Sequence, residues 1–352
     1  MREGAGSLSH RLAIGLIGIG DIGWRHATLL ADNPRARLVV AADPVAERLA
    51  AASGLFSEVT ADWCMVMSRR DVEAVFITTP PHLHREMTLA ALEAGKHVFL
   101  EKPMTATMAD ADAIVEQAQG SDRVVLVGFQ ERHNIAFLEM RRAIQEGALG
   151  DVLFFRGTGR IPRKRLEKGW LFNTAQGGGA VMESSIHNWD LARWMTGQEF
   201  VRVYAEGHVM EKQGGRYEDT FVGIGRLSEG ALVEIEACFS LPDGTAFDSR
   251  IEVVGTRGMA YYDVGRQPLL ISSEVGYTLA DRRITGTAVP DLIHIGPEMG
   301  AYQREHEHFL DCIQRGVEPA VSVEDSRRSL AVALAVVDSI HTGQPVVLDG
   351  DR

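Results

Sequence analysis

The feature that most constrains this chain is a glycine-rich turn between an apolar run and a helical pattern near the amino terminus. The apolar run is 12–17, the helical pattern is 21–31, and the turn contains Gly18, Gly20 and Gly23. Gly18 permits the turn, Gly20 has no Cβ to block a pyrophosphate, and Gly23 lets the helix pack tightly on the strand. Because free N–H groups at a helix start attract phosphates, this stretch predicts a strand, turn and helix that bind a dinucleotide.

A carboxylate follows at the spacing that such a site requires. The second apolar run, 36–42, ends in Asp43, where the ribose-binding carboxylate of a dinucleotide site falls. Pro44 and Val45 follow it, so a 2′-phosphate would meet a carboxylate with no cation directly after it. We therefore expect NAD rather than NADP, with Arg48 as the nearby cation that would favour NADP. The alternative interpretation is an ordinary glycine turn with Asp43 as a plain helix cap.

Length, charge and cysteine content limit the class of the protein. At 352 residues the chain is long for one core and fits two domains. The formal net charge of -12 argues against nucleic acid or an anionic membrane as the main partner, since either would need a basic face. Cys64, Cys238 and Cys312 lie far apart in the sequence, which suits a reducing cytoplasm. The apolar run 12–19 is too short to span a bilayer, so we expect neither a signal peptide nor a transmembrane helix.

Apolar runs and helical patterns alternate as far as Gly128, which predicts an α/β fold with a doubly wound parallel sheet. Ligands of such sheets bind outside the carboxyl ends of the strands, where the glycine turn, Pro80, Lys102 and Phe129 all fall. We therefore expect these residues to line one crevice. The predicted strands after Asp43 are 59–60, 74–79, 97–100 and 124–128, and the predicted helices are 45–53, 63–68, 83–94 and 107–119.

The pattern changes beyond Gly128. Strand-like runs follow one another from 201 to 273 without a long helix between them, so we expect a mostly antiparallel sheet with helices on one face. The other predicted elements are a helix over 135–146, a strand over 152–157, an irregular basic loop over 160–169, a helix from about Gly179, helices over 302–315 and 323–342, and a final strand over 346–348.

Two groups of residues are candidates for catalysis. Lys102 stands at a strand's carboxyl end, where burial would lower its pKa and let it exchange protons with a substrate hydroxyl. Read alone, Glu101-Lys102-Pro103 is also a common surface turn. Glu183 and His187 are four residues apart, which places them on one helix face, and Asp190 is a further turn along. The alternative for His187 is a core hydrogen bond without a catalytic role.

The order of motifs along the chain resembles the glucose-fructose oxidoreductase, inositol dehydrogenase and rhizopine-catabolism family (Gfo/Idh/MocA). The resemblance covers nearly the whole chain, and its specific signal is the order and spacing of the motifs together. The motifs are the glycine turn, Asp43, Thr79-Pro80-x-x-x-His84, Ala94-Gly95-Lys96-His97-Val98, Glu101-Lys102-Pro103, Gly128-Phe129-Gln130-x-Arg132-x-Asn134, Gly177-Gly178-Gly179, His187-x-x-Asp190 and Ser339-x-x-x-Thr342-Gly343-x-Pro345-Val346.

The resemblance implies a fold, a reaction and a set of site residues. It implies a Rossmann domain over 11–130 and, over 131–352, an α+β domain with a large open sheet for substrate binding and oligomerisation. The implied activity is that of an NAD(P)-dependent sugar or cyclitol dehydrogenase acting on CH–OH, assembled as a homodimer or homotetramer. The implied cofactor contacts are Gly18, Gly20, Asp21, Ile22, Gly23, Asp43, Thr79, Pro80, His84, Glu101, Lys102, Gln130 and Arg132. The implied substrate contacts are Lys102, Arg163, Trp170, Glu183, His187 and Asp190.

Three of these residues carry the implied chemistry. Lys102 matches the family's catalytic lysine and His187 its active-site histidine, while Glu183 falls where inositol dehydrogenases usually carry aspartate. His187 is the natural base for a secondary alcohol, because an unperturbed histidine has a pKa of about 6.5. Lys102, as a cation, would stabilise developing alkoxide charge, and Glu183 would orient His187 or bind a neighbouring hydroxyl. Asp190 has either a hydrogen-bonding role near the substrate or a structural role.

Two further charged stretches bear on ligand binding. A basic loop before the glycines at 177–179 would receive the carboxylate or phosphate of an anionic sugar, unless it is simply solvated. Its cations are Arg160, Arg163, Lys164, Arg165 and Lys168. In the run 305–308, His306 and His308 are two residues apart and would point in different directions on a helix, so we predict no metal site.

Two other functions fit the same motifs. An NAD-dependent glycosidase would use transient oxidation to acidify a ring C–H and permit elimination, without net NADH production. A redox-silent dinucleotide-binding sensor would have no need of a proton-transfer pair, so the presence of Lys102 and His187 argues against it.

Overall fold

The computed structural model describes residues 10–162, 169–212, 214–242, 245, 247–263 and 299–348, and the backbone of 267–279 and 282–288. The chain divides into two compact units. The first consists of the chain through Thr105, Ala109–Gly128 and Tyr302–Glu324, and the second consists of Ala106–Met108, Phe129–Ala301 and the chain from Asp325 onward. The first unit thus includes a late segment, 302–324, that the sequence-based division at residue 130 assigned to the second domain.

The first unit contains a six-stranded parallel sheet, as the alternating sequence pattern predicts. Its strand order, β3-β2-β1-β4-β5-β6, is doubly wound about β1. Ile17 pairs with Ala42 and Ile77, so the carboxyl ends of three strands lie level with the glycine turn. Glu101 pairs with Gly128 at the ends of the next two strands. The strands are β1 (Leu12–Ile17), β2 (Ala36–Ala42), β3 (Glu58–Thr60), β4 (Ala74–Ile77), β5 (His97–Glu101) and β6 (Val125–Gly128).

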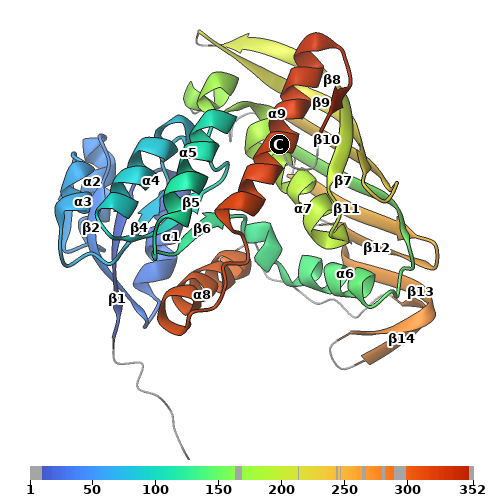
Figure 1. Ribbon diagram of the computed structural model, residues 1–352, viewed down its shortest axis with the longest axis horizontal. Helices are drawn as coiled ribbons and strands as arrows, with labels where there is room; N and C mark the ends of the chain where they lie inside the picture. The colour runs from blue at the N-terminus through green and yellow to red at the C-terminus, as the bar shows by residue number, and fades with distance from the viewer. Residues whose placement is uncertain are drawn as a thin grey trace, which may run out of the picture. The chain divides into compact units, whose positions relative to one another are not determined.

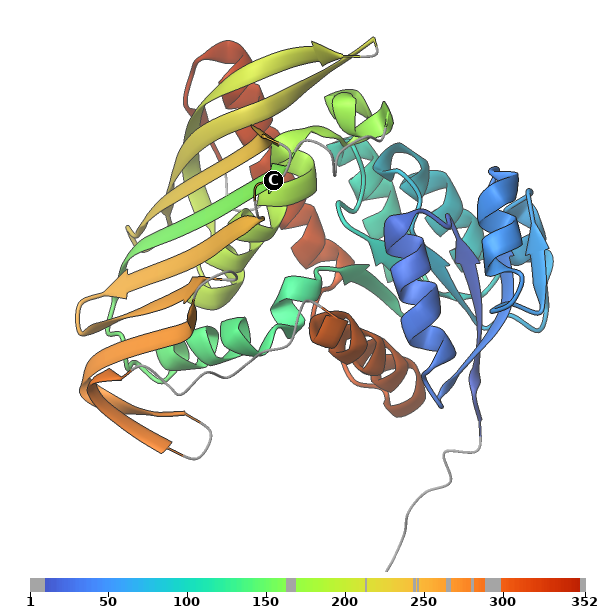
Figure 2. The same cartoon turned by 180° about the vertical axis from the view of Figure 1, so that it is seen from behind.

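Helices cover both faces of this sheet. Helices α4 and α5 lie on the near face in Figure 1, and α1 lies on the opposite face, which is turned toward the viewer in Figure 2. On the α1 face, Phe76 of β4 packs with Leu30 of α1 and Phe309 of α8 in one buried core. The helices are α1 (Asp21–Ala31), α2 (Ala46–Ala52), α3 (Cys64–Ser68), the 3-10 turn η1 (Pro81–Leu83), α4 (His84–Glu93), α5 (Met108–Gln119) and α8 (Met299–Arg315).

The second unit contains a nine-stranded sheet in the order β14-β13-β12-β11-β7-β10-β9-β8-β15. Neighbouring strands are antiparallel except β7 and β10, which run parallel. The expected mostly antiparallel sheet is therefore confirmed. The strands are β7 (Val152–Pro162), β8 (Phe200–Lys212), β9 (Gly215–Leu227), β10 (Leu232–Leu241), β11 (Asp248–Gly255), β12 (Gly258–Asp263), β13 (Gln267–Leu279), β14 (Arg282–Ala288) and β15 (Val346–Val347).

Strand β7 is longer than the sequence predicted. It continues to Pro162 rather than ending at Gly157, because it has a partner on both sides. β10 pairs with it as far as Leu241 and Pro162, and β11 pairs with it from Asp248 and Arg160 onward. Arg160 is therefore part of a strand, which corrects the expectation that it belongs to an irregular loop.

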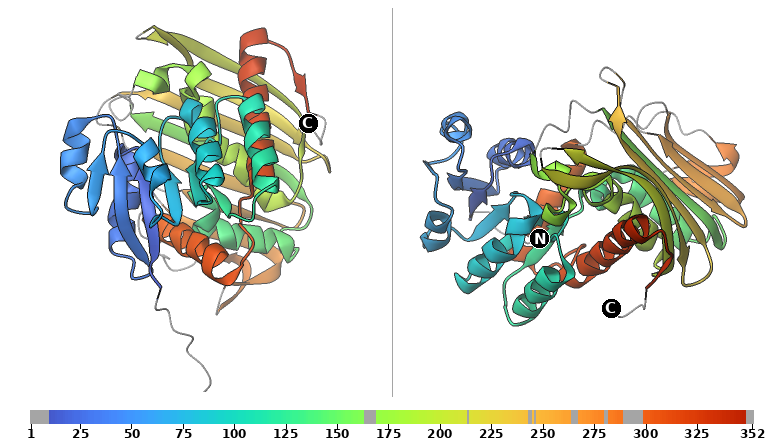
Figure 3. Two further views of the ribbon diagram at one scale, coloured as in Figure 1. Left: turned by 60° about the vertical axis from the view of Figure 1, so that its left-hand side comes forward. Right: turned by 90° about the horizontal axis from the view of Figure 1, so that it is seen from above.

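Helices α6 (Ile135–Gln145), α7 (Ile186–Thr196) and α9 (Val323–Thr342) lie on one face of this sheet (Figure 3). Two glycines let α7 approach the strands closely. A Cβ added at Gly157 would lie 2.9 Å from the Cβ of Asn188, and one added at Gly223 would lie 3.1 Å from the ring of the buried Trp189. Because α7 packs so closely on the strands, most of its surface is buried and only one strip stays accessible.

Candidate active site

The glycine turn is shaped by contacts that only glycine permits. Gly18 has a φ of +94°, and a Cβ there would lie 2.9 Å from the carbonyl group of Thr78. A Cβ on Gly23 would lie 1.9 Å from the carbonyl oxygen of Gly18, so α1 packs directly on the turn. At Gly20, an added Cβ would meet no atom of the described residues within 4 Å. An open turn at the start of a helix fits the pyrophosphate of a dinucleotide, with Asp21 at the first helical position.

Asp43 holds this turn in place. Its buried carboxylate accepts a hydrogen bond from the N–H of Ile19 at 2.7 Å and another from the N–H of Val45 at 2.9 Å. The first bond lies inside the glycine turn and the second holds Val45, which is the N-cap of α2, so Asp43 is not itself the helix cap. Arg48 lies against the same carboxylate, with Nη1 3.3 Å from Oδ2.

His84 links two loops at the carboxyl ends of the strands. Its Nε2 lies 2.8 Å from the carbonyl oxygen of Thr79, and its Nδ1 lies 3.1 Å from that of Pro103. The ring is fully buried, and burial lowers the pKa of His84 despite the carbonyl acceptors, which act to raise it. Through these carbonyl groups, His84 fixes the loop after β4 to the segment that follows Lys102.

Glu101 and Lys102 mark the end of β5. Glu101 is buried, whereas Lys102 is partly exposed. One carboxylate oxygen of Glu101 accepts a hydrogen bond from the backbone N–H of Lys102 at 3.0 Å, and the other lies 2.8 Å from Nε2 of His26. His26 stands one turn of helix beyond the last glycine of the turn and belongs to none of the candidate site residues that the sequence indicates.

The segment that carries Glu183 and His187 is not a uniform helix. Residues Val181–Ser185 form a π-helical turn, and α7 begins only at Ile186. This corrects the predicted continuous helix. Between 181 and 193 the side chains are buried except at Glu183, Ser184 and His187. π-helical turns inside helices are frequent at functional sites, and this one places an acid and an imidazole on the accessible strip.

His187 is more accessible than a core histidine would be. Its ring meets Phe129 edge-on, with ring centroids 5.8 Å apart and an interplanar angle of 81°. The buried Phe129 follows β6 directly and precedes the 3-10 turn Gln130–His133. A partly exposed imidazole held by an aromatic edge is available for proton transfer, which favours the catalytic over the core interpretation of His187.

The glycines at 177–179 allow three segments to meet before the π-helical turn. A Cβ on Gly178 would lie 2.4 Å from the carbonyl oxygen of Trp170, and one on Gly179 would lie 2.7 Å from Oε2 of Glu218. Glu218 is buried on β9 and accepts a hydrogen bond from the hydroxyl of Thr174 at 2.8 Å. Trp170, an implied substrate contact, is thereby brought beside the glycines that lead to His187.

Arg132 and Asp190 form a buried ion pair with each other. The side chains are 2% and 1% exposed, and two bonds of 2.6 and 2.8 Å join the guanidinium to the carboxylate. Asp325 also contacts Arg132, and Ser329 donates to Asp190 at 2.6 Å. The neighbouring carboxylates hold the pKa of Arg132 above its usual value against the opposing effect of burial. This arrangement favours the structural alternative for Asp190, whereas the cofactor contact expected of Arg132 stays a prediction.

The cations of the expected basic loop are only partly described. Arg163, Lys164, Arg165 and Lys168 lie outside the described residues. Arg160 contacts Glu236 on β10 and Asp248 on β11, so its charge is matched by carboxylates within the sheet. The structure therefore gives Arg160 a role in joining three strands, and anion binding by the basic residues stays a prediction.

The two histidines of α8 contact different partners. Nε2 of His306 lies 2.6 Å from Nδ1 of His26, whereas Nε2 of His308 accepts a hydrogen bond from the N–H of Ala320 at 2.8 Å. Burial lowers the pKa of His308. In the part of the chain that the structure describes, no group of three or more histidine, cysteine or acidic residues has the arrangement of a metal site. The described helices also include none that is both long and apolar enough to cross a bilayer.

Comparison with known protein families gives matches over both units. Residues 12–129 match the NAD-binding Rossmann-fold domain of an oxidoreductase family, and residues 141–348 match the C-terminal alpha/beta domain of the same Gfo/Idh/MocA family. The chain belongs to the Gfo/Idh/MocA oxidoreductases. Among similar curated proteins, scyllo-inositol 2-dehydrogenase (NAD(+)) of Bacillus subtilis is 30% identical, with 98% of each chain covered. Myo-inositol 2-dehydrogenase of Thermotoga maritima is 28% identical, covering 96% of this chain and 99% of that protein.

Solved structures of the family share the fold of this Gfo/Idh/MocA protein. A levoglucosan dehydrogenase in complex with NADH and levoglucosan is 27% identical, with a TM-score of 0.84 and coverage of 96% of this chain and 99% of that one. A putative myo-inositol dehydrogenase from Sinorhizobium meliloti 1021 is 28% identical, with a TM-score of 0.79 and coverage of 96% and 100%. The chain is therefore an NAD-dependent oxidoreductase of the class that acts on CH–OH groups, and the glycine turn fits that cofactor.

Proposed function

We propose that this chain is an NAD-dependent dehydrogenase that oxidises a secondary alcohol of a cyclitol, a sugar or a sugar acid. The observation that carries the proposal is the pair of acid and base side chains, Glu183 and His187, on the accessible strip of an otherwise buried helix. The similar proteins named as inositol and levoglucosan dehydrogenases support polyhydroxylated rings as the substrate class.

The proposed mechanism assigns one task to each side chain. Bound NAD supplies the acceptor for the carbinol hydride. His187 accepts the hydroxyl proton on an imidazole nitrogen, and Glu183 orients that imidazole or binds a neighbouring hydroxyl. Lys102 donates a hydrogen bond to the same alcohol oxygen and stabilises the negative charge that develops there. Trp170 belongs to the proposed substrate contacts, as does Arg163, which lies outside the described residues.

A substrate screen tests this function. Purified protein is incubated with NAD and, separately, inositols, levoglucosan, aldoses, uronic acids and glycosides, while NADH absorbance and substrate consumption are both followed. We expect NADH to accumulate with at least one free polyol or sugar. Glycoside consumption without net NADH would indicate the glycosidase alternative. NAD binding without turnover of any compound would favour the sensor.

We expect a preference for NAD over NADP that depends on Asp43 and Arg48. Replacement of Asp43 by Ser removes the carboxylate that would face a 2′-phosphate and releases Arg48 from its contact. The variant should lower kcat/KM for NAD and raise it for NADP. The matched control is the double variant Asp43→Ser/Arg48→Ala, which should lose the gain with NADP. Comparable kcat/KM values with both cofactors in the wild-type protein would contradict the assigned preference.

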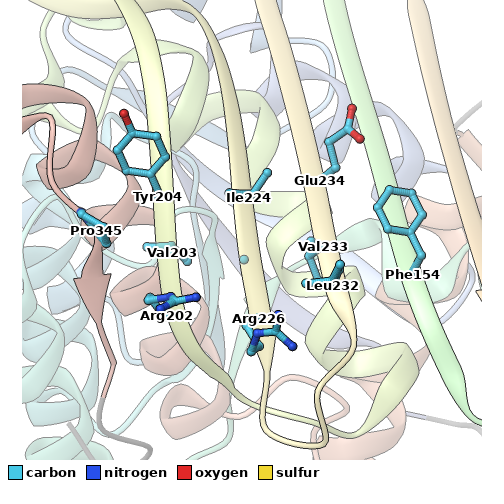
Figure 4. A pocket seen from close by; sticks show the side chains of 11 residues that line it. Phe154, Arg202, Val203, Tyr204, Ile224, Arg226, Leu232, Val233, Glu234 and Pro345 are labelled. Atoms are coloured by element: carbon cyan, nitrogen blue, oxygen red, sulfur yellow. The ribbon is translucent and has the colours of Figure 1, made fainter.

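We also propose that the chain forms homo-oligomers through the helix-free face of the nine-stranded sheet. Apolar side chains stand exposed there on neighbouring strands, and Ile224 of β9 is 55% exposed. Figure 4 shows Ile224, Leu232 and Phe154 on three neighbouring strands, with the charged residues Arg226 and Glu234 among them. Exposed apolar patches rimmed by polar residues are typical of protein–protein interfaces. The unpaired cysteines, Cys64 among them, support a cytoplasmic location for the assembly.

The double variant Ile224→Glu/Leu232→Glu is expected to convert the oligomer to a monomer. Both replacements place a carboxylate in the proposed interface, where burying an unpaired charge is unfavourable. Light scattering coupled to gel filtration should then give the chain mass of 38.5 kDa rather than a multiple of it. Met65→Glu, an exposed apolar position on α3, serves as the control and should leave the oligomer intact. A monomeric wild-type protein would contradict the proposed interface.

A further inference from the structure

A buried chain of three titratable side chains runs through the first unit and ends at the backbone of Lys102. Nε2 of His306 lies 2.6 Å from Nδ1 of His26, and Nε2 of His26 lies 2.8 Å from Oε1 of Glu101. Oε2 of Glu101 accepts a hydrogen bond from the N–H of Lys102 at 3.0 Å. We call His306, His26 and Glu101 the His–His–Glu chain. The proposed action of Lys102 on the alcohol oxygen does not involve the His–His–Glu chain.

The chain joins three elements and is closed off from solvent. His26 lies on α1, Glu101 ends β5 and His306 lies on α8; their exposed fractions are 0%, 6% and 1%. Aromatic rings surround His26, with centroids of Phe99 and Tyr302 at 5.0 and 5.4 Å. Burial removes the hydration of these polar groups, which is unfavourable unless other hydrogen bonds replace it. The hydrogen bonds within the His–His–Glu chain do so.

The chemistry of the members sets the direction of the hydrogen bond to Glu101. An ionised carboxylate only accepts, so Nε2 of His26 carries the proton shared with Glu101. One further proton is shared between Nδ1 of His26 and Nε2 of His306, and it joins the two rings whichever of them carries it. The two imidazoles therefore orient one oxygen of Glu101, which leaves its other oxygen directed at the N–H of Lys102.

Lys102 needs such support because it lies just beyond the sheet. The pairing of β5 with β6 ends at Glu101 and Gly128, so Lys102 lies one residue beyond it. A displacement of about 1 Å at a catalytic group can lower turnover by about 10²-fold. The Glu101 carboxylate, held by two buried imidazoles, binds the backbone N–H of Lys102 and thereby fixes the position of its Cα.

We propose that Glu101 is a positioning residue for Lys102 and that His26 and His306 hold the Glu101 carboxylate in the orientation that binds the Lys102 N–H. The proposal rests on the proposed function, because it concerns the lysine that acts on the alcohol. It extends that function to His26 on α1 and to His306 on α8, and His306 lies in the late segment 302–324 of the first unit.

Three variants separate positioning from simple packing. His26→Phe keeps a ring within the aromatic surroundings and removes both hydrogen bonds. His26→Gln keeps an amide N–H where Nε2 donates to Glu101. Phe309→Leu is the matched control, because Phe309 is fully buried on α8 and packs on Phe76 and Phe99 but makes no hydrogen bond through its side chain.

The first readout is kinetic. We expect His26→Phe to lower kcat by about tenfold to 100-fold with little change in the Kd of NADH, because it displaces Lys102 without removing it. His26→Gln should recover most of that loss. Phe309→Leu should lower Tm by creating a cavity and keep kcat near the wild-type value. The proposal is overturned if Phe309→Leu lowers kcat as much as His26→Phe, or if His26→Phe lowers Tm alone.

The second readout does not depend on activity and so separates this proposal from the proposed function. Hydrogen exchange of the Lys102 amide, followed by NMR, should be slow in the wild-type protein, since a buried carboxylate accepts its proton. Exchange should accelerate in His26→Phe and stay slow in His26→Gln and Phe309→Leu. Unchanged exchange in His26→Phe contradicts the proposal. Accelerated exchange in a protein that oxidises no sugar or cyclitol would support the positioning role and reject the proposed function.

Discussion

Replacement of His187 by alanine is expected to lower kcat by about 10²–10⁴-fold, the range that general-base catalysis contributes. The variant loses the imidazole that takes the hydroxyl proton in the proposed mechanism. Its affinity for NADH should be unchanged, because the glycine turn and Asp43 belong to the other compact unit. Steady-state kinetics and fluorescence titration with NADH measure the two quantities separately.

Lys102→Ala distinguishes the base from the charge-stabilising group. Removal of a preorganised donor of this kind lowers kcat by about 10²–10³-fold. His187→Ala should lose the near-neutral limb of the pH profile of kcat/KM, and Lys102→Ala should keep it. The double variant should lose less than the product of the two single effects, because residues that act in one step are not additive.

An exposed histidine provides the control for these variants. His208 lies on β8 of the second unit with its side chain exposed, so His208→Ala should keep wild-type kcat and pH dependence. A profile in which Lys102→Ala loses the near-neutral limb and His187→Ala keeps it would assign the base to Lys102. Near-normal turnover in both variants would contradict the mechanism.

Removal of one member of the Arg132 and Asp190 pair is expected to have the largest effect on stability. Asp190→Leu removes the carboxylate that makes two bonds to the buried guanidinium of Arg132 and leaves its contact with Asp325 in place. Loss of one partner from a buried ion pair costs about 3–5 kcal/mol, because a charge is left buried without compensation. Urea unfolding, monitored by circular dichroism, measures the change in the free energy of unfolding.

Two further variants show whether burial causes this effect. Arg132→Leu/Asp190→Leu removes both charges and should recover part of the loss, since apolar replacements of a buried pair are often neutral. Asp122→Asn breaks the exposed contact with Arg123 and should leave the free energy of unfolding nearly unchanged, because water and salt screen the pair. A cost for Asp190→Leu no greater than that of Asp122→Asn would show that the buried pair contributes little.

The contacts of Asp325 with Arg132 and Arg193 also predict how the free energy of unfolding depends on pH. Burial acts to raise the pKa of Asp325, but Arg132 and Arg193 outweigh it, and the pKa falls below its usual 3.8. A carboxyl group with a depressed folded-state pKa stabilises the fold above its unfolded pKa, and this contribution is lost as pH falls through the folded value. The free energy of unfolding should therefore fall less steeply below about pH 4 in Asp325→Asn than in the wild-type protein.

Much of the fold could be predicted because the signals that specify it act over short distances. Gly18 adopts a positive φ, and Gly23 leaves room for α1 to pack on the turn. The strand, the turn and the helix are therefore all specified by residues 12–31. Alternation of apolar runs and helical patterns implies a parallel sheet, and its strand ends then place Asp43 and Lys102 at one edge of the sheet. The spacing of Glu183 and His187 likewise puts both on one strip, even though Glu183 lies in the π-helical turn and His187 lies in α7.

Only the tertiary structure decided which distant polar groups meet. Arg132 and Asp190 are 58 residues apart in the sequence and were assigned to different ligands, yet they neutralise each other in the second unit. His26 and His306 are 280 residues apart, and they meet because the segment 302–324 returns to the first unit. Residue types and local periodicity specify an element and its buried face, but the partner of a buried charge depends on how elements pack. That packing is determined by the fit of whole surfaces, and no local pattern in the sequence records it.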